Sequence, residues 1–362
     1  MPSFYPVIPA GGSGTRLWPL SRQVEPKFLH RLGADHRSLM QLTLARLEPL
    51  APAAQTFIVC GANHREAIMR QVPKVPVGNL IVEPAGRNSG PAIALAAAII
   101  EQLDPEAVMG SFAADHLISY GEAFRDAIRT AIDVAQTGRL VTVAVTPTRP
   151  ETGYGYIESG EPLGIGDALD VVRFKEKPDA ATAEKYVASG RFFWNAGMFV
   201  WRVADLMEQL REQAPEIAER VQQVADLWVR DYEGALAKLD EVWVDMPSIS
   251  IDHAVVEGTA AQGKLATVPA DMGWSDIGDW DTIAEMGTHE GSRLEQPKET
   301  LLIDSPGSFA TSGTGRAVTV IGVPDVVVVE TKTAILVVKR DEAQRVKEAV
   351  EEWKARGRED LL

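Results

Sequence analysis

The sequence is poor in cysteine and in cationic side chains. Cys60 is its single cysteine, so an internal disulfide is excluded and a reducing compartment is expected. Lysine and arginine number 36 against 51 aspartates and glutamates, which gives a formal net charge of −15. A nucleic-acid-binding domain usually carries a basic field, so this charge balance argues against a nucleic-acid partner. Any anionic ligand must be bound by cations placed locally against the overall charge.

Long apolar runs are also missing. The longest, residues 92–100, is about half the length of a membrane-spanning helix. Residues 1–10 have neither the basic start nor the apolar core of a signal peptide, so we expect a cytoplasmic protein with no membrane partner. The chain has 362 residues, of which 45% are hydrophobic and 24% charged, enough for one large domain and a smaller one.

Strand-like and helix-like segments alternate through the first two-thirds of the chain. The alternation predicts a mainly parallel sheet with helices on both faces, an α/β fold. Ligands of such sheets bind beyond the carboxyl ends of the strands. Strands are predicted at residues 5–9, 57–60, 80–83, 108–113 and 140–145, and helices at residues 38–47, 64–71, 91–103 and 120–136.

The pattern changes near residue 290, and we predict two domains, residues 1–290 and 291–362. Residues 291–298 are polar and are expected to connect them. The second domain is predicted to be all-β with a terminal amphipathic helix at residues 341–356. Its short strands leave exposed edges, so it should pack on the main domain or on another subunit. These strands are predicted at residues 301–303, 317–321, 326–330 and 334–338.

The segment AGGSGTRLWPLSRQVEPK, residues 10–27, follows the first predicted strand. Its glycines at positions 11, 12 and 14 let the backbone approach a ligand and point N–H groups at it, while Arg16 and Lys27 supply cations. This combination suits a nucleoside triphosphate. The segment does not match the dinucleotide fingerprint, because residues 18–20 interrupt it, nor the P-loop, because no lysine follows Gly14. By itself, the glycine-rich loop could also be an ordinary turn.

Two further segments place polar groups at strand ends. The sequence EPAGRNSGP, residues 83–91, follows a predicted strand and opens a helix, although proline and glycine here could be turn chemistry alone. The sequence FAADH, residues 112–116, puts Asp115 at the end of a buried strand. A carboxylate there is placed for Mg²⁺, or it could cap the next helix. His116 is expected to orient a neighbour or contact a ribose, because Mg²⁺ prefers oxygen.

Segments of the second half carry groups that suit a hexose phosphate. They are ETGYGY at 151–156, FKEKP at 174–178 and WNAGMF at 194–199. Carboxylates and amides form hydrogen bonds with the hydroxyl groups of a sugar, and a lysine suits a phosphate. On its charge pattern alone, the 174–178 segment would more readily be an exposed charged strand end. The sequences SIDHAVVE at 250–257 and GWSDIGDW at 273–280 add Asp252 and Asp276.

In this order, these motifs resemble those of the mannose-1-phosphate guanylyltransferases, in the sugar-nucleotide pyrophosphorylase family, over residues 5–355. The resemblance implies a Rossmann-like, GT-A-like nucleotidyltransferase domain of three α/β/α layers and a small C-terminal domain like a left-handed β-helix. It also implies the short form, without an isomerase domain. Asp279 departs from the serine or threonine usual in the family, and Phe28 from glutamine or proline.

Carried over residue by residue, the resemblance implies a role for each position. Arg16 and Lys27 would be catalytic, on the triphosphate and at the reacting phosphates. Asp115 and Asp276 would hold Mg²⁺. The sugar phosphate would be bound by Gly153, Glu176, Lys177 and Asn195. The nucleotide would be bound by Ala10, Gly11, Gly12, Ser13, Gly14, Thr15, Glu83, Pro84, Arg87, Asn88 and Asp115.

The implied reaction joins GTP to mannose 1-phosphate, forming GDP-mannose and pyrophosphate, and a homodimer is expected. One alternative is the same chemistry on another pair, such as glucose 1-phosphate with UTP or dTTP. A second is a non-catalytic subunit that senses a sugar nucleotide. The presence of both aspartates, Asp115 and Asp276, argues against a sensor, which need not keep metal ligands.

Overall fold

The computed structural model describes residues 2–12, 14–32, 37–288 and 298–362. Within these ranges, nine strands form one sheet in the order β3-β2-β1-β4-β9-β6-β10-β8-β7. Along the sheet, the bounds are β3 (Leu80–Glu83), β2 (Phe57–Gly61), β1 (Phe4–Ala10), β4 (Val108–Ser111), β9 (Phe192–Arg202), β6 (Leu140–Val145), β10 (Leu265–Pro269), β8 (Leu169–Lys175) and β7 (Gly155–Pro162).

The sheet is mixed, so the prediction of a mainly parallel sheet is wrong. Strands β3, β2, β1 and β4 are parallel, as predicted, and β6 is parallel to β10. Between these groups, β9 runs antiparallel to both β4 and β6. β7 and β8 form an antiparallel pair, and β7 also pairs antiparallel with β9. β9 thus separates the four parallel strands β3, β2, β1 and β4 from a mixed group, in which β6 and β10 are parallel while β8 runs antiparallel to β10 and β7.

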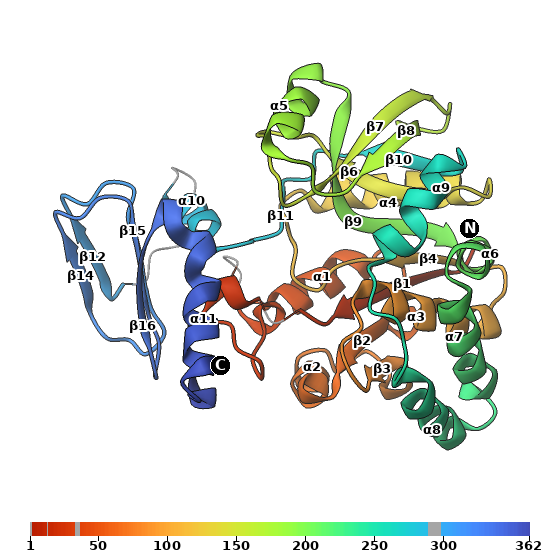
Figure 1. The fold of residues 1–362 in the computed structure, drawn as a ribbon, viewed down its shortest axis with the longest axis horizontal. Coiled ribbons are helices and arrows are strands. Elements are labelled where there is room, and N and C mark those ends of the chain that lie inside the picture. Colours follow the sequence, from red (N-terminus) through yellow and green to blue (C-terminus); the bar gives the residue numbers. More distant parts are fainter. Residues whose placement is uncertain (1, 13, 33–36, 289–297) are drawn as a thin grey trace.

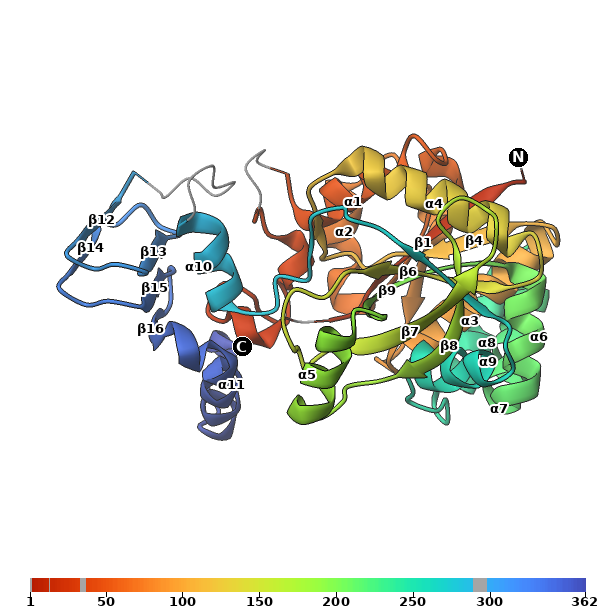
Figure 2. The ribbon, with the colours of Figure 1, turned by 90° about the horizontal axis from the view of Figure 1, so that it is seen from above.

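Helices cover both faces of the sheet, as predicted (Figures 1 and 2). One face carries α3 (Ser89–Leu103), α6 (Val203–Gln213), α7 (Pro215–Trp228) and α8 (Tyr232–Trp243). The other carries α1 (Leu39–Leu47), α2 (Arg65–Gln71) and α4 (Gly121–Ala135). The helix α3 is apolar around its whole circumference and is buried between the sheet and α7, as expected of a central helix. α9 (Glu257–Ala261) packs on β8, and its Ala260 belongs to the apolar cluster of the first face. α5 (Ala180–Ser189) lies outside these two groups (Figure 1).

The C-terminal unit begins with α10 (Trp280–Thr288) and continues as short parallel strands. β12 (Thr300–Ile303) pairs with β14 (Val318–Ile321), and β13 (Phe309–Ser312) pairs with β15 (Val326–Glu330), both in parallel. This alternation between two sheets is a β-helix-like coil. β16 (Ile335–Lys339) then pairs antiparallel with β15, and a 3-10 segment leads into α11 (Val346–Ala355). The sequence did not predict β13. The predicted domain boundary and most of the connector lie outside the described residues.

The C-terminal unit packs on the main domain through the chain that joins β1 to α1 (Figure 1). Leu17 and Trp18 of this connection share an apolar cluster with Trp280 of α10, Phe309 of β13 and Val346 of α11. The C-terminal unit was expected to pack on the main domain or on another subunit, and here the loop that follows the first strand of the main domain packs against it. Within the described residues, no helix has the length and apolar character needed to cross a bilayer.

Candidate active site

The glycine loop leaves the end of β1 and folds back against Lys27. Gly14 has a φ of 65°, and a Cβ at this position would lie 2.7 Å from the Cβ of Lys27, so glycine is required here. Gly11 and Gly12 are exposed, which leaves their backbone open to a ligand. Thr15 is exposed at the start of a 3-10 turn, and Ala10 is buried as the last residue of β1. Ser13 lies outside the described residues.

Lys27 brings the two predicted metal ligands together. Its side chain is only 7% exposed, and its Nζ donates to Asp115 Oδ2 over 2.7 Å and to the main-chain carbonyl of Asp276. Asp115 follows β4, whereas Asp276 follows the two-residue strand β11 (Trp274–Ser275), which pairs with β5 (Leu117–Ile118). Burial opposes ionisation of Asp115, but the charge of Lys27 and its hydrogen bond outweigh this effect, so the pKa of Asp115 is lowered.

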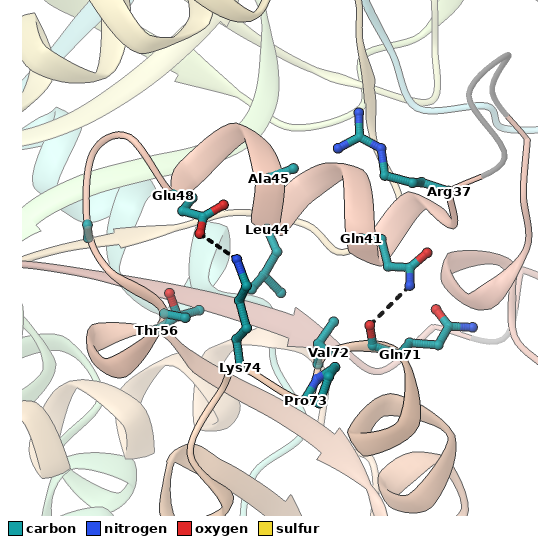
Figure 3. A pocket seen from close by; sticks show the side chains of 12 residues that line it. Arg37, Gln41, Leu44, Ala45, Glu48, Thr56, Gln71, Val72, Pro73 and Lys74 are labelled. Atoms are coloured by element: carbon teal, nitrogen blue, oxygen red, sulfur yellow. Dashed lines mark hydrogen bonds and ion pairs between the residues drawn. The ribbon is translucent and has the colours of Figure 1, made fainter.

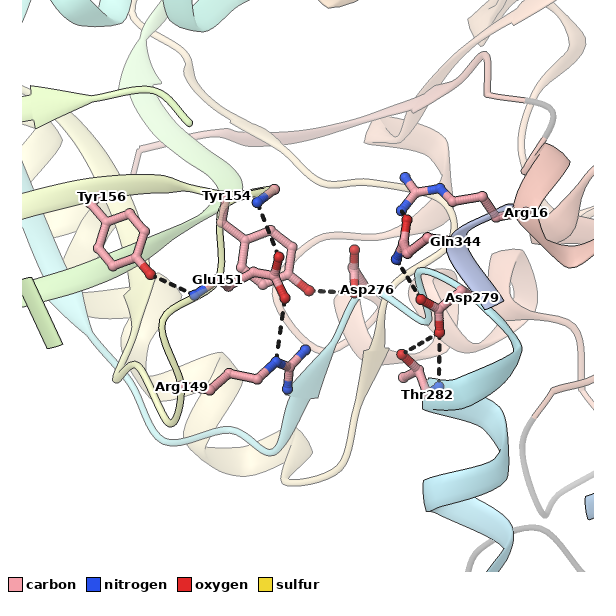
Figure 4. A network of polar contacts seen from close by, with 10 residues as sticks. Arg16, Arg149, Glu151, Tyr154, Tyr156, Asp276, Asp279, Thr282 and Gln344 are labelled. Atoms are coloured by element: carbon pink, nitrogen blue, oxygen red, sulfur yellow. Dashed lines mark hydrogen bonds and ion pairs between the residues drawn. The ribbon is translucent and has the colours of Figure 1, made fainter. Parts of the chain in front are cut away.

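Tyr154 orients the carboxylate of Asp276 (Figure 4). Its hydroxyl donates to Asp276 Oδ1 over 2.7 Å. Burial and the neighbouring carboxylate raise the pKa of Tyr154, so the hydroxyl stays protonated and able to donate. The loop that carries Tyr154 is braced by Glu151, whose carboxylate accepts from Gly153 N over 3.1 Å and whose own amide donates to the hydroxyl of Tyr156 over 2.9 Å. Tyr154 was not assigned a role from the sequence, although it lies in the predicted TGYGY motif.

The donor set at Asp115 and Asp276 fits a hard divalent cation. Each carboxylate uses one oxygen in the hydrogen bonds to Lys27 and Tyr154, and its second oxygen lies outside those bonds. A Cβ on Gly278 would lie 3.2 Å from Asp276 Oδ2, so the glycine keeps the space beside that oxygen open. Among the described residues, no three His, Cys, Asp or Glu side chains gather as a closed metal cage. A pair of carboxylates completed by substrate phosphates is the arrangement that Mg²⁺ commonly takes.

His116 is neutral and is hydrogen-bonded to Trp274. Its Nδ1 accepts a hydrogen bond from Trp274 Nε1 over 3.1 Å, and an indole N–H can only donate, so the ring proton lies on Nε2. Burial lowers the pKa of His116 to about 4. The contact with the Trp274 indole agrees with a role in orienting a neighbour, and the alternative role as a ribose contact stays a prediction.

The predicted sugar-phosphate residues line one cavity of about 290 Å³. Gly153, Glu176, Lys177 and Asn195 are brought together there from the loops and strands β7, β8 and β9, and Asp276 lies in the same wall. The lining also includes His116, Tyr154, Gly155, Asp252 and Trp274.

Two local features explain how this cavity is built. A Cβ on Gly155 would lie 2.5 Å from Glu176 Oε2, so glycine at this position lets the glutamate enter. Lys177 has a φ of 42°, an uncommon left-handed conformation for a lysine, and its Nζ lies 3.1 Å from Glu176 Oε1. The side chain of Lys177 is 62% exposed, whereas that of Glu176 is 15% exposed. The lysine therefore stands at the mouth of the cavity and the glutamate inside it.

Asp252 is a cavity residue that the sequence assignment left out. It accepts a hydrogen bond from Asn195 Nδ2 over 2.7 Å, while Asn195 Oδ1 accepts from the amide of Gly197 over 3.1 Å. Burial and the nearby Glu176 raise the pKa of Asp252 to about 6. It begins a π-helical segment, Asp252–Val256, a type of distortion that is frequent at functional sites. The sequence signal that could have assigned Asp252 to the cavity was the SID motif at residues 250–252.

The 83–91 segment divides into a part that faces the glycine loop and a part that does not. Glu83 is buried at the end of β3, and the position of a Cβ on Gly11 lies 3.6 Å from Glu83 Oε1. Its Oε2 is buried with no hydrogen-bond partner among the described residues, and burial raises the pKa of Glu83 to about 7. Cys60, on the neighbouring strand, is a buried thiol as predicted, and burial raises its pKa to about 12.

The remainder of that segment is directed elsewhere. Arg87 Nη2 donates to the carbonyls of Val244, over 2.6 Å, and Trp243, over 3.3 Å, at the end of α8. Asn88 caps α3 by accepting from Ser89 N over 2.8 Å, with a φ of 68°. Pro84 is exposed. The nucleotide roles of these three residues therefore stay predictions.

Arg16 belongs to a polar network that reaches the C-terminal unit (Figure 4). Its Nη1 donates to Gln344 Oε1 over 3.1 Å, and Gln344 Nε2 donates to Asp279 Oδ2. The same Nη1 lies 3.6 Å from the position of a Cβ on Gly278, next to Asp276. Asp279 also caps α10 by accepting from Thr282 N over 2.9 Å. These contacts give a role to Asp279, whose departure from the family pattern the sequence left unexplained.

A second cavity, of about 330 Å³, lies away from the strand ends, between α1 and the segment after α2 (Figure 3). Lys74 Nζ lies 2.9 Å from Glu48 Oε1, and the Gln41 side chain donates through Nε2 to the main-chain carbonyl of Gln71 over 3.1 Å. The rest of its lining is largely aliphatic. The side chains suited to binding phosphates, sugar and metal therefore lie at the edge of the sheet, around Lys27.

Comparisons with known proteins identify the family of this chain. A family model described as nucleotidyl transferase matches residues 5–292, and one described as MannoseP isomerase/GMP-like beta-helix domain matches residues 298–353. The mannose-1-phosphate guanylyltransferase of Escherichia coli K12 is 39% identical over 366 residues, which cover 98% of this chain and 74% of the relative. The mannose-1-phosphate guanylyltransferase ManC of Salmonella typhimurium LT2 is 40% identical over 370 residues, with the same two coverages.

A solved structure is similar over nearly the whole chain. It is the crystal structure of a Thermus thermophilus protein described as mannose-1-phosphate geranyltransferase. Its TM-score is 0.84 at 32% sequence identity, and the match covers 97% of this chain and 99% of that one. The likeness therefore includes the C-terminal unit as well as the large sheet.

Proposed function

Because this chain belongs to the nucleotidyl transferase family and, within it, to the mannose-1-phosphate guanylyltransferases, we propose that it joins GTP to mannose 1-phosphate, forming GDP-mannose and pyrophosphate. The observation that carries the proposal is the position of Lys27. Its ammonium contacts Asp115 and Asp276, at the border between the glycine loop and the cavity lined by Glu176. A nucleotide on the loop and a sugar phosphate in the cavity would present their phosphates to this border.

The reaction needs little covalent chemistry from the protein. An oxygen of the sugar phosphate attacks the α-phosphorus of GTP in line, and pyrophosphate leaves. The second pKa of a phosphomonoester is about 6, so the attacking phosphate is already anionic near neutral pH and no general base is required. Catalysis then consists of positioning the two phosphates and neutralising charge as the α-phosphorus changes geometry. Arg16 and the loop amides would bind the triphosphate, Lys27 would face the reacting phosphates, and Lys177 would bind the sugar phosphate.

Asp115 and Asp276 would hold a divalent metal, for which we propose Mg²⁺. Enzymes of this family generally use a divalent metal. When bound, the ion supplies charge that draws phosphate oxygens into place and stabilises the transition state. The chain's own contribution is to keep Asp115 ionised through Lys27 and to orient Asp276 through Tyr154.

Glu83 supports the choice of guanine. Its buried Oε2 has no hydrogen-bond partner among the described residues, and in its ionised form this carboxylate can only accept hydrogen bonds. The Watson–Crick edge of guanine offers two adjacent donors, at N1 and N2, whereas that of uracil or thymine offers one donor between two acceptors. A carboxylate beside the glycine loop therefore favours GTP over UTP or dTTP.

The assembly and location of the protein are further parts of the proposal. Leu301, Ile303, Ile321 and Val323 are 40–62% exposed on and beside the β12–β14 pair, an apolar face that would suit a second copy of the chain. A homodimer is therefore expected, with its mass in solution as the measurement. The single cysteine supports a cytoplasmic location.

The proposal is tested by measuring pyrophosphate release in a matrix of nucleotides and sugar phosphates. GTP with mannose 1-phosphate should give the highest kcat/KM, well above UTP with glucose 1-phosphate. The reverse order would assign the site to another nucleotide sugar. Tight binding of GDP-mannose without any turnover would instead support a sensing subunit.

A further inference from the structure

A glutamine of the C-terminal unit lies between the glycine loop and a buried carboxylate. Gln344 belongs to the 3-10 segment Arg340–Arg345, which precedes α11. Its Oε1 accepts from Arg16 over 3.1 Å and its Nε2 donates to Asp279, which is 7% exposed (Figure 4). Arg16 itself is exposed. An exposed arginine has many side-chain conformations, and this contact selects one of them.

The chemistry of the three groups fixes the orientation of the glutamine amide. A guanidinium only donates and an ionised carboxylate only accepts. The amide must therefore turn its oxygen to Arg16 and its nitrogen to Asp279. Because Thr282 N and Oγ1 donate to Asp279 Oδ1 over 2.9 and 3.1 Å, the carboxylate is itself held by the first turn of α10. Only one orientation of the Gln344 amide therefore satisfies all the hydrogen bonds between α10 and Arg16.

The loop that carries Arg16 is anchored to the C-terminal unit at other points as well. Trp18 Nε1 donates to the Leu361 carbonyl over 2.7 Å, and Trp280 Nε1 donates to the Trp18 carbonyl over 2.9 Å. Arg22 Nη1 donates to the Asp360 carbonyl over 2.9 Å. The backbone of the loop is therefore fixed independently of Gln344, so that changing the glutamine should affect the Arg16 side chain and leave the loop in place.

The guanidinium is held beside the predicted metal ligands. Arg16 Nη1 and Asp276 Oδ2 lie 3.6 and 3.2 Å from the same point, the position that a Cβ on Gly278 would take. We propose that Gln344 is a positioning residue: with Asp279 it holds Arg16 over the turn at Asp276, so that the C-terminal unit completes the triphosphate half of the site. This inference rests on the proposed function, in which Arg16 binds the triphosphate of GTP.

The variant that tests it is Gln344→Met, which keeps the length of the side chain and removes both polar atoms. Arg16 then regains its conformational freedom, and we expect kcat/KM for GTP to fall by about ten-fold, with KM for mannose 1-phosphate unchanged. Asp279→Ser should have the same effect, because a serine can still cap α10 but cannot reach Gln344. The matched control is Arg345→Ala, because Arg345 pairs with Glu342 of its own segment and with Glu348 of α11. That variant should behave as wild type.

A double-mutant cycle separates positioning from a structural effect. In an Arg16→Ala background, Gln344→Met should cause no further loss, because the residue it positions is gone. A wild-type kcat/KM for GTP in both Gln344→Met and Asp279→Ser would overturn the inference, and so would full additivity with Arg16→Ala. If the wild-type enzyme released no pyrophosphate, the proposed function would fail. Calorimetric binding of inorganic tripolyphosphate would then still test Gln344, with weaker binding in Gln344→Met expected and equal binding overturning the inference.

Discussion

The ammonium of Lys27 lies 2.7 Å from Oδ2 of Asp115, with the lysine side chain 7% and the aspartate side chain 34% exposed. A charge as buried as this lysine is stable only with a partner, and here the carboxylate of Asp115 and the carbonyl of Asp276 supply it. The contact joins the loop after β1, the end of β4 and the turn after β11. These three segments therefore form one unit at the edge of the sheet.

Replacing Lys27 should chiefly slow the chemical step. In Lys27→Met the charge facing the reacting phosphates is lost, and we expect kcat to fall by about ten- to a thousand-fold. GTP binding by the free enzyme should change much less, because Arg16 and the loop amides remain. Steady-state kinetics and calorimetric titration with GTP measure the two effects. A kcat near wild type would mean that Lys27 only stabilises the fold.

Replacing Lys177 should act on the sugar phosphate alone. Lys177→Ala removes an exposed cation at the mouth of the cavity, and we expect KM for mannose 1-phosphate to rise by about ten-fold while the Kd for GTP stays constant. The matched control is Lys175→Ala, which removes an exposed lysine at the end of β8, two residues before Lys177. This variant should leave both constants unchanged. Loss of GTP binding with normal mannose 1-phosphate kinetics would show that the two halves of the site are assigned wrongly.

The two aspartates should be required for activity with metal. Asp115→Asn and Asp276→Asn each remove a charge from the site, and we expect kcat to fall by orders of magnitude at ordinary Mg²⁺ concentrations. Wild-type enzyme treated with a chelator should lose activity and regain it when Mg²⁺ is added. Tyr154→Phe keeps both charges and should mainly raise the Mg²⁺ concentration needed for half-maximal rate. Full activity of either asparagine variant would exclude that residue as a ligand.

Glu83 should make stability depend on pH in a defined direction. Burial raises its pKa from 4.5 to about 7 in the folded protein. Between these values the folded state binds a proton that the unfolded state has lost, so this group lowers stability as pH rises through the window. Glu83→Gln removes the effect and should therefore be more stable than wild type at about pH 8, by at most about 3 kcal/mol, with little difference near pH 4.5.

Urea unfolding of wild type and Glu83→Gln at both ends of that pH range measures the difference. Glu161→Gln, which alters an exposed glutamate on β7, is the control and should show no such divergence. A stability difference that stays constant with pH would contradict the ionisation argument. The same Glu83→Gln variant should also discriminate less between GTP and UTP.

Much of the site could be predicted from the sequence because its residues follow strands. Asp115 comes after β4 and Glu83 ends β3, and the carboxyl ends of parallel strands share one edge of a sheet. The helix predicted at residues 38–47 is also present, as α1, which Ser38 caps. The family resemblance then supplied the roles.

What could not be predicted depends on contacts between distant segments. The antiparallel insertion of β9 between β4 and β6 is a matter of strand order, which hydrophobic periodicity does not encode. β13 is only four residues long and ends in Thr311 and Ser312, so its pattern is too weak to indicate a strand. The hydrogen bond from Arg16 to Gln344 joins residues that are 328 positions apart, and the sequence around neither residue indicates its partner.

The central claim is that GMP is transferred from GTP to the phosphate of mannose 1-phosphate, and labelled GTP tests it most directly. The enzyme would be incubated with Mg²⁺, mannose 1-phosphate and GTP labelled with ³²P at either the α or the γ position. The account predicts that the α label appears in GDP-mannose and the γ label in pyrophosphate, in equal amounts. A γ label transferred to the sugar, or no transfer of the α label with both substrates bound, would contradict it.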